Sequence, residues 1–311
     1  MSNSLDNSLN YFSKVRLQTM NLINHLNHED MVVQSELFVS PIKWHLAHTT
    51  WFFENFILKK FKKRYKVFDK KFSYLFNSYY NKVGLYNPKN KRGLLVRPSI
   101  EKIFEYRKYI DDEVCELIDM NKENDKILYL VELGINHEQQ HQELILMDIL
   151  NIFYSCPFKP SYKKSKKSKN IKASKFTWSN NQKINFKYGY TSNKFSYDNE
   201  CPSGVIDLNP FEIDIDFVTV GDWKEFIAFG GYDRPELWLS DGWDFIKQNK
   251  ISMPMYWIDI NNYFTLNGVV KLKNSLPVSN ISFYEANAYC RYKKKRLPTE
   301  FEVEFFLKKN K

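Results

Sequence analysis

Apolar residues recur at helical spacing along the first half of the chain. In residues 4–28 they fall near every third or fourth position, which predicts an amphipathic helix. The same spacing predicts helices over about 40–60, from residue 98 onward, and over about 124–153. Segment 61–98 is aromatic and basic and is interrupted by Gly and Pro, so it is predicted to be a long connection. Four amphipathic helices with one long crossover predict a four-helix bundle.

A start signal marks the second of these helices. Ser40 is followed by Pro41, and Ser is favoured as an N-cap residue while Pro is favoured at the first helical position. We therefore expect the Ser40 side chain to cap this helix.

The pattern changes at the end of the predicted bundle domain, residues 1–155. Residues 156–175 are rich in Lys and Ser and lack apolar periodicity, so they are predicted to form a solvated, protease-sensitive linker. In residues 176–311, Gly, Pro, Asn and Asp interrupt short aromatic runs, which is typical of an α+β domain with many loops. Two short helices are predicted there, over 221–229 and 282–293.

Composition narrows the classes of function. The chain has 46 Lys and Arg against 36 Asp and Glu, a net charge of +10, but only eight of the basic residues are Arg and Asn is abundant. A coding bias toward Lys and Asn explains this, so no nucleic-acid partner is expected. No apolar run reaches 18 residues and no secretory signal begins the chain, so no membrane partner is expected. The four Cys form no C-x-x-C pair, which fits a reducing, cytoplasmic location.

The six histidines carry the clearest chemical signal. All lie in the first half, in three pairs spaced by three or four residues: His25 and His28, His45 and His48, His137 and His141. Such spacing places both rings of a pair on one face of a helix. His137 and His141 could therefore chelate one metal ion, with a third histidine from the second helix. Imidazole-only ligation suits zinc, copper, iron or nickel, and three ligands leave coordination positions open, as in a catalytic site.

These histidines allow other interpretations. The letters H-E-Q-Q-H also match the H-E-x-x-H motif of zinc proteases, in which Glu138 would be the general base. His45 lies one turn from His48 and is expected to support or pack against the site. His25 and His28 lie near a helix end and are expected to be solvated.

Several sequence blocks together resemble a known enzyme family, the ergothioneine-biosynthesis sulfoxide synthases. In the first half the blocks are SPIKWHLAHTTWFFE (40–54), FNSYYNKVG (76–84), RGLLVRPS (92–99) and HEQQHQELILMDIL (137–150). In the second half they are YDNECP (197–202), VTVGDWKEFIAFGGY (218–232), LWLSDGWDF (237–245), PMYW (254–257) and ISFYEANAYCRYKKKRLPTEFEVE (281–304). The resemblance implies an α + (α+β) fold class. A DinB-like four-helix bundle would precede a partial formylglycine-generating-enzyme-like domain, which is related to C-type lectin folds.

The resemblance also implies an activity. Such an enzyme would use non-haem Fe(II) and O₂ to join a thiol, γ-glutamylcysteine or cysteine, to the imidazole C2 of hercynine, giving a sulfoxide. The iron ligands would be His48, His137 and His141. Gln140 would lie beside the substrate imidazole. Either Arg92 or Arg97 would hold the thiol's carboxylate, and the resemblance does not choose between them.

The chain departs from the family pattern at its end. The family's second domain continues past R-L-P-T-E, so the proton-donor Tyr and the groups that hold hercynine are expected beyond Lys311. We therefore expect an incomplete record, a truncated product or half of a split enzyme with a complementing C-terminal polypeptide. Aromatic residues such as Trp238, Trp257 and Phe283 are then expected to lack some of their packing partners. The alternatives are a related enzyme forming a C–S or C–Se bond to hercynine, and a non-catalytic metal-binding remnant.

Overall fold

The chain folds into two compact units. A computed structural model describes residues 5–163 and 177–310, so the predicted linker lies outside the described residues from residue 164 onward. The first unit comprises residues 1–164 with 265–268, and the second comprises 165–264 and 269–311.

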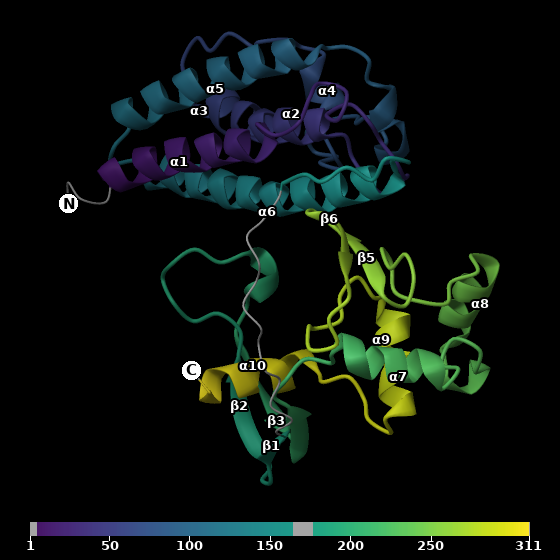
Figure 1. Cartoon of the computed structure of the whole chain (residues 1–311). Coiled ribbons are helices and arrows are strands. Elements are labelled where there is room, and N and C mark those ends of the chain that lie inside the picture. The colour runs from purple at the N-terminus through teal and green to yellow at the C-terminus, as the bar shows by residue number, and fades with distance from the viewer. Residues whose placement is uncertain (1–4, 164–176, 311) are drawn as a thin grey trace. The chain divides into compact units, whose positions relative to one another are not determined.

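Helices form almost all of the regular structure of the first unit (Figure 1). They are α1 (Leu5–Ile23), α2 (Ile42–Phe53), α3 (Lys59–Phe61), α4 (Phe72–Leu75), α5 (Ile100–Met120) and α6 (Asp125–Ser155), with a π-helix over Glu54–Leu58 and a 3-10 helix over Lys89–Leu94. The four long helices α1, α2, α5 and α6 pack against one another as a bundle, as the apolar periodicity predicts. The predicted connection 61–98 is correct in outline, although it contains α4 and the 3-10 helix.

The helix ends follow the expected caps in part. Ser99 caps α5 by accepting from the backbone N–H of Lys102, and Asn124 caps α6 in the same way. The expected Ser40 cap is wrong. Pro41 occupies the N-cap position of α2 with no side-chain cap hydrogen bond, because the Ser40 hydroxyl accepts from Arg92 instead.

The bundle core is built from the apolar faces of the long helices. Its fully buried members include Phe12, Trp51, Phe53, Tyr106 and Ile110. Burying a side chain of this size contributes about 1.5–3 kcal/mol. Helix α2 differs from its neighbours because all twelve of its residues are buried, so it runs through the middle of this core.

The second unit contains short strands and helices in the order β1–β4, α7, α8, β5, β6, α9, α10. The strands are β1 (Thr177–Asn180), β2 (Ile184–Tyr188), β3 (Gly204–Leu208), β4 (Phe211–Asp214), β5 (Asn262–Thr265) and β6 (Gly268–Lys271). The helices are α7 (Val220–Ala228), α8 (Ser240–Gln248), α9 (Phe283–Tyr292) and α10 (Glu300–Lys309). Within the described residues the strands form three two-stranded sheets, and the β1–β4 and β2–β3 pairs are antiparallel. The predicted α+β character is confirmed, and α7 and α9 match the two predicted helices.

Aromatic side chains dominate the core of the second unit. One cluster gathers Trp223, Phe226 and Tyr289, and Trp223 stacks on Tyr289 with ring centroids 5.1 Å apart. The expectation that Trp238 and Trp257 would lack packing partners is wrong, because both are buried in this cluster, whereas Phe283 is largely exposed. A second cluster packs α10 against the β2–β3 sheet through residues such as Phe305 and Phe186.

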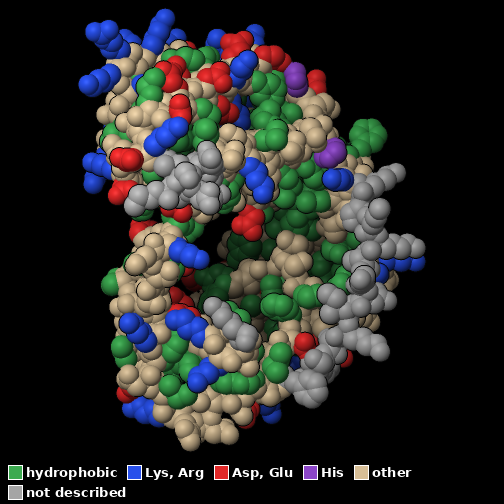
Figure 2. Space-filling view, turned by 90° about the vertical axis from the view of Figure 1, so that its left-hand side faces the viewer, with side chains coloured by type: hydrophobic (Ala, Val, Ile, Leu, Met, Phe, Trp, Pro, Cys, Tyr) green, Lys and Arg blue, Asp and Glu red, His purple; other side chains and the backbone are tan. Residues whose placement is uncertain are grey.

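The surface of the chain is mixed in charge. On the face in Figure 2, Lys and Arg side chains are interspersed with Asp and Glu.

Among the helices of the described residues, none combines the length and the apolar character needed to cross a bilayer. The four cysteines are unpaired.

Candidate metal centre

The three histidines predicted as metal ligands lie together in the bundle. His48 comes from α2, and His137 and His141 come from α6. Each offers one ring nitrogen, and these three atoms all lie within 4.8 Å of one another. His48 and His141 are buried, and His137 is partly exposed. Across residues 5–163 and 177–310, no other three His, Cys, Asp or Glu residues meet in this way.

A glycine lets the two helices that carry the histidines come close. Gly134 lies on α6 one turn before His137. A Cβ atom at Gly134 would lie 2.6 Å from Cε1 of Phe53 on α2, a contact that real Cβ atoms essentially never make. The absence of a side chain at this position therefore allows α6 to approach α2 near the cluster.

Hydrogen bonds orient two of the three rings. His48 Nδ1 lies 2.6 Å from the carbonyl oxygen of Phe76. A carbonyl only accepts, so Nδ1 carries the proton and Nε2 keeps its lone pair. His141 Nδ1 lies 2.8 Å from Nδ1 of His45, whose Nε2 lies 2.9 Å from Asp148 Oδ2. His137 differs, because its Nδ1 is buried without a hydrogen-bond partner in the described part of the chain.

Burial keeps the rings neutral at physiological pH. It is the largest cause lowering the pKa of His48 and of His141 well below the ordinary value, and the neighbouring histidines and Arg92 lower both further. Burial also lowers the pKa of His137 to about 4. A histidine must be neutral to bind a metal ion, so this environment favours ligation.

The structure separates the two arginines between which the sequence could not choose. Arg92 is buried, and its guanidinium carbon lies 3.3 Å from the centroid of the Trp44 ring, which stacks on His48 at 4.5 Å. Burial lowers the pKa of Arg92 to about 10, so it remains a cation at neutral pH, and its Nε has no hydrogen-bond partner in the described part of the chain. Arg97 is exposed. Gln140 is also exposed, one turn from His137 on α6.

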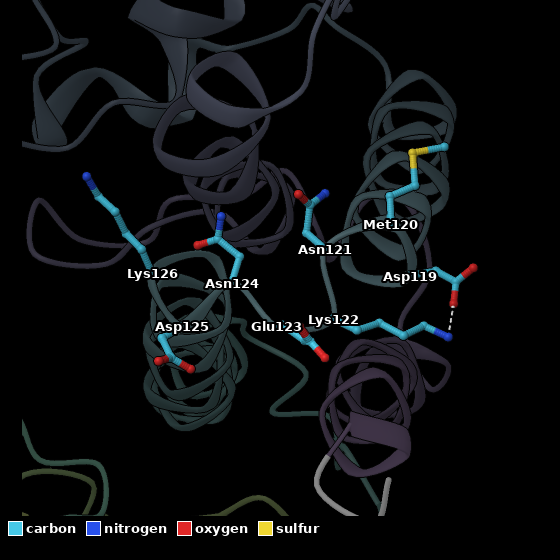
Figure 3. A pocket seen from close by; sticks show the side chains of 8 residues that line it. All are labelled: Asp119, Met120, Asn121, Lys122, Glu123, Asn124, Asp125 and Lys126. Atoms are coloured by element: carbon cyan, nitrogen blue, oxygen red, sulfur yellow. Dashed lines mark ion pairs between the residues drawn. The ribbon is translucent and has the colours of Figure 1, made fainter. Parts of the chain in front are cut away.

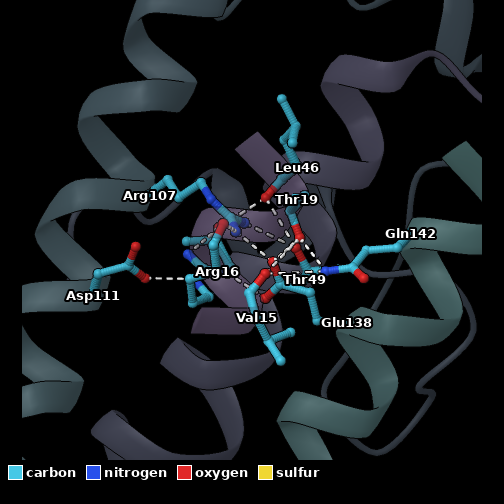
Figure 4. Close-up of polar contacts among 10 residues, drawn as sticks. Val15, Arg16, Thr19, Leu46, Thr49, Arg107, Asp111, Glu138 and Gln142 are labelled. Carbon is cyan, nitrogen blue, oxygen red and sulfur yellow. Dashed lines mark hydrogen bonds and ion pairs between the residues drawn. The ribbon is translucent and has the colours of Figure 1, made fainter. Parts of the chain in front are cut away.

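The Glu138 carboxylate lies in a buried ionic network (Figure 4). Its carboxylate accepts from Arg16 Nη1 at 2.8 Å, from Thr19 Oγ1 at 2.6 Å, and from Arg107 Nη2. Burial acts to raise its pKa, but Arg107 and Arg16 outweigh burial and hold the pKa at about 2. A carboxylate held by two guanidinium groups is not available as a general base, so the zinc-protease interpretation has no support in this geometry.

A shallow hollow on the bundle surface lies away from the histidine cluster. It is formed by the turn between α5 and α6, residues 119–126 (Figure 3). His137 lies 12 residues further along α6 than Asp125, which is about 18 Å at 1.5 Å per residue. The hollow is lined by the side chains of one exposed turn and has no part in the histidine cluster.

Sequence reasoning missed several residues that surround the cluster. Asp148, Trp44 and the Phe76 carbonyl all contact the histidines or their partners. Asp148 carried a recognisable signal, because it is a lone acid in the apolar run LILMDIL and lies two turns after His141 on the same helix face. His25 and His28 are exposed, as expected.

Comparisons with known proteins divide the chain in the same way. Residues 11–145 match the DinB superfamily, and residues 168–308 match the sulfatase-modifying factor enzyme 1-like domain. The chain is 36% identical over 109 residues to a protein of Mycolicibacterium smegmatis named hercynine oxygenase, covering 35% of this chain and 26% of that relative. A protein of the same name from Mycobacterium tuberculosis is 36% identical over 110 residues, again 35% and 26% of the two chains.

Another relative has a different name. A Bos taurus protein named inactive C-alpha-formylglycine-generating enzyme 2 is 31% identical over 125 residues, covering 35% of this chain and 41% of that protein. The chain spans about a quarter of the length of the hercynine oxygenases it matches. The chain thus joins a region that matches the DinB superfamily to a region that matches the sulfatase-modifying factor enzyme 1-like domain, and part of it is similar to proteins named hercynine oxygenase.

Proposed function

We propose that the chain is a hercynine oxygenase that uses non-haem Fe(II) and O₂ to join a thiol to C2 of the hercynine imidazole. The thiol is γ-glutamylcysteine or cysteine. In the overall reaction the S–H bond of the thiol and the C2–H bond of the imidazole break, and an S–C bond forms. One oxygen atom of O₂ becomes the sulfoxide oxygen, and the other leaves as water with both hydrogens.

The observation that carries this proposal is the His48, His137 and His141 cluster. Three neutral imidazoles on two helices fit an iron ion that keeps open coordination positions. The buried, unpartnered Nδ1 of His137 adds to this fit, because a polar atom of this kind costs free energy unless a bound ion or ligand satisfies it. Bound Fe(II) supplies the redox chemistry that O₂ requires and lowers the pKa of a coordinating thiol.

Arg92 is the group we assign to the carboxylate of the thiol. It is a buried cation, it has a free donor, and it contacts His48 through the Trp44 ring. A planar guanidinium matches a carboxylate well. Gln140, exposed beside His137, is assigned to the substrate imidazole.

The experiment starts with anaerobic reconstitution of the full chain with Fe(II). Iron content is measured first, and the sulfoxide is then detected by mass spectrometry after adding O₂, hercynine and each thiol. We expect one iron per chain in the wild type and in the exposed-histidine control His28→Ala, and loss of iron and product in His137→Ala. Stoichiometric iron in His137→Ala would overturn the ligand assignment.

The second candidate function is metal binding without catalysis. The matches to proteins named inactive favour it. The same experiment separates the two candidates, because iron bound at one per chain with no sulfoxide from either thiol would favour the second.

A further inference from the structure

A continuous set of hydrogen bonds joins Arg92 to His141. Arg92 Nη1 donates to Ser40 Oγ at 2.9 Å, and the Ser40 backbone N–H donates to Asp148 Oδ2 at 2.9 Å. The same carboxylate oxygen lies 2.9 Å from His45 Nε2, and His45 Nδ1 lies 2.8 Å from His141 Nδ1. The Asp148 side chain is 15% exposed, and the other four residues are buried.

The chemistry of the partners determines where the ring protons lie. A carboxylate accepts and does not donate, so His45 donates its Nε2–H to Asp148. A neutral imidazole carries one ring proton, so His45 Nδ1 then has a lone pair and accepts from His141 Nδ1–H. His141 is left with a lone pair on Nε2, which is the nitrogen it can offer to a metal ion.

Without the Asp148 carboxylate, the positions of the protons on the two imidazole rings are no longer determined. His45 could then carry its proton on Nδ1 and donate it to His141 Nδ1. The His141 proton would move to Nε2 and occupy the lone pair that a metal ion needs. The carboxylate therefore selects between two tautomers of a ring that it does not touch.

We propose that Asp148 and His45 are positioning residues that hold His141 in its Nδ1–H tautomer, with Nε2 aimed at the metal site. This inference rests on the proposed metal site and adds a carboxylate–histidine pair behind one of its ligands. Ser40 ties the pair to Arg92, because its N–H binds Asp148 and its hydroxyl binds the guanidinium. Partners of this kind behind a metal ligand contribute about 10–100-fold to metal affinity.

The test reads the tautomer directly in the full chain without metal. Long-range proton–nitrogen NMR correlations distinguish protonated from unprotonated ring nitrogens of His141. Binding of Co²⁺ alone is then measured by visible absorption. The variants are Asp148→Leu and His45→Phe. The same substitutions at exposed positions, Asp119→Leu and His28→Phe, are the matched controls, since those side chains are 66% and 61% exposed.

We expect the wild type and both controls to carry the His141 proton on Nδ1. In the two variants we expect mixed tautomers and a Co²⁺ dissociation constant raised about 10–100-fold. A wild-type His141 protonated on Nε2, or unchanged Co²⁺ affinity in both variants, would overturn the proposal.

The proposal can still be tested if a variant does not fold. His45→Gln then replaces His45→Phe, and the wild-type tautomer is a test by itself. The tautomer is read without metal, hercynine or thiol. A wild type that forms no sulfoxide would therefore count against the proposed function and leave this inference intact.

Discussion

Replacing Glu138 by Gln tests whether the buried ionic network holds the bundle together. The substitution keeps the size of the side chain and its hydrogen bond from Thr19, but removes the negative charge. Arg16 and Arg107, whose side chains are 4% and 3% exposed, would then have only Asp111 as a nearby counter-charge. The position is informative because Glu138 is adjacent to His137, yet its carboxylate contacts the two arginines of the ionic network.

The expected loss of unfolding free energy follows from the burial of the Glu138 ion pairs. Removing one member of a buried, hydrogen-bonded ion pair costs about 3–5 kcal/mol, because the remaining charge has lost both water and its partner. Glu138 is fully buried and contacts two guanidinium groups, so we expect a loss in this range. With a denaturant dependence of roughly 2 kcal/mol per molar urea, the unfolding midpoint of the bundle should fall by about 1.5–2.5 M.

The assay is urea unfolding of the full chain followed by far-ultraviolet circular dichroism, which the long helices of the bundle dominate. The control is Asp119→Asn. Its ion pair with Lys122 also joins a carboxylate to a basic side chain, but both side chains are more than half exposed, so we expect less than about 1 kcal/mol. A loss below about 1 kcal/mol for Glu138→Gln would refute the reasoning, since the two arginines would then have been solvated or neutralised by other means.

Four further predictions concern stability and the site. Because the folded pKa of Glu138 is about 2, below its ordinary 4.5, wild-type stability should fall between about pH 4.5 and 2 more steeply than that of Glu138→Gln, as acid titration followed by circular dichroism would show. Gly134→Ala should cost about 1–3 kcal/mol by overpacking and weaken Co²⁺ binding, as urea unfolding and visible absorption would show. For the proposed reaction, Arg92→Met should cost about 1.5–3 kcal/mol in kcat/KM for the thiol, whereas Arg97→Met should leave it unchanged in steady-state assays. Thr219→Ala should remove the capping box of α7 and cost about 0.5–2 kcal/mol, measurable by thermal unfolding.

The sequence alone was sufficient to predict helices with periodic apolar residues and side-chain pairs at a fixed helical spacing. The long helices α5 and α6 have one apolar face each, so their periodicity located them to within a few residues. The histidine pair on α6 was recognisable because a helix places residues four apart on one face. The sequence analysis did not predict helix α8, because glycine is unfavourable inside a helix and Gly242 is one of its nine residues. The reason for a glycine here is visible only in the fold, where a side chain at this position would collide with Tyr284.

The details of the site depend on contacts between distant segments. Nothing in the spacing of Arg92 and Arg97 distinguishes them, since only the fold buries one over Trp44 and exposes the other. Likewise, Glu138 matches the glutamate of the zinc-protease motif in sequence. Its role in the ionic network is visible only from its contacts with Arg16 and Arg107, which lie far away in the sequence.

The complete burial of α2 has a consequence for protein engineering. A helix whose every side chain meets the core offers no position where mutation is neutral, so a library built on Ile42–Phe53 would consist mostly of unfolded variants. The connection between α2 and α5 offers more freedom, because residues such as Tyr79, Leu85 and Leu94 are largely exposed while Phe76 and Arg92 in the same segment reach the site. Directed evolution of the proposed site should therefore diversify this segment and leave the helix that carries His48 unchanged.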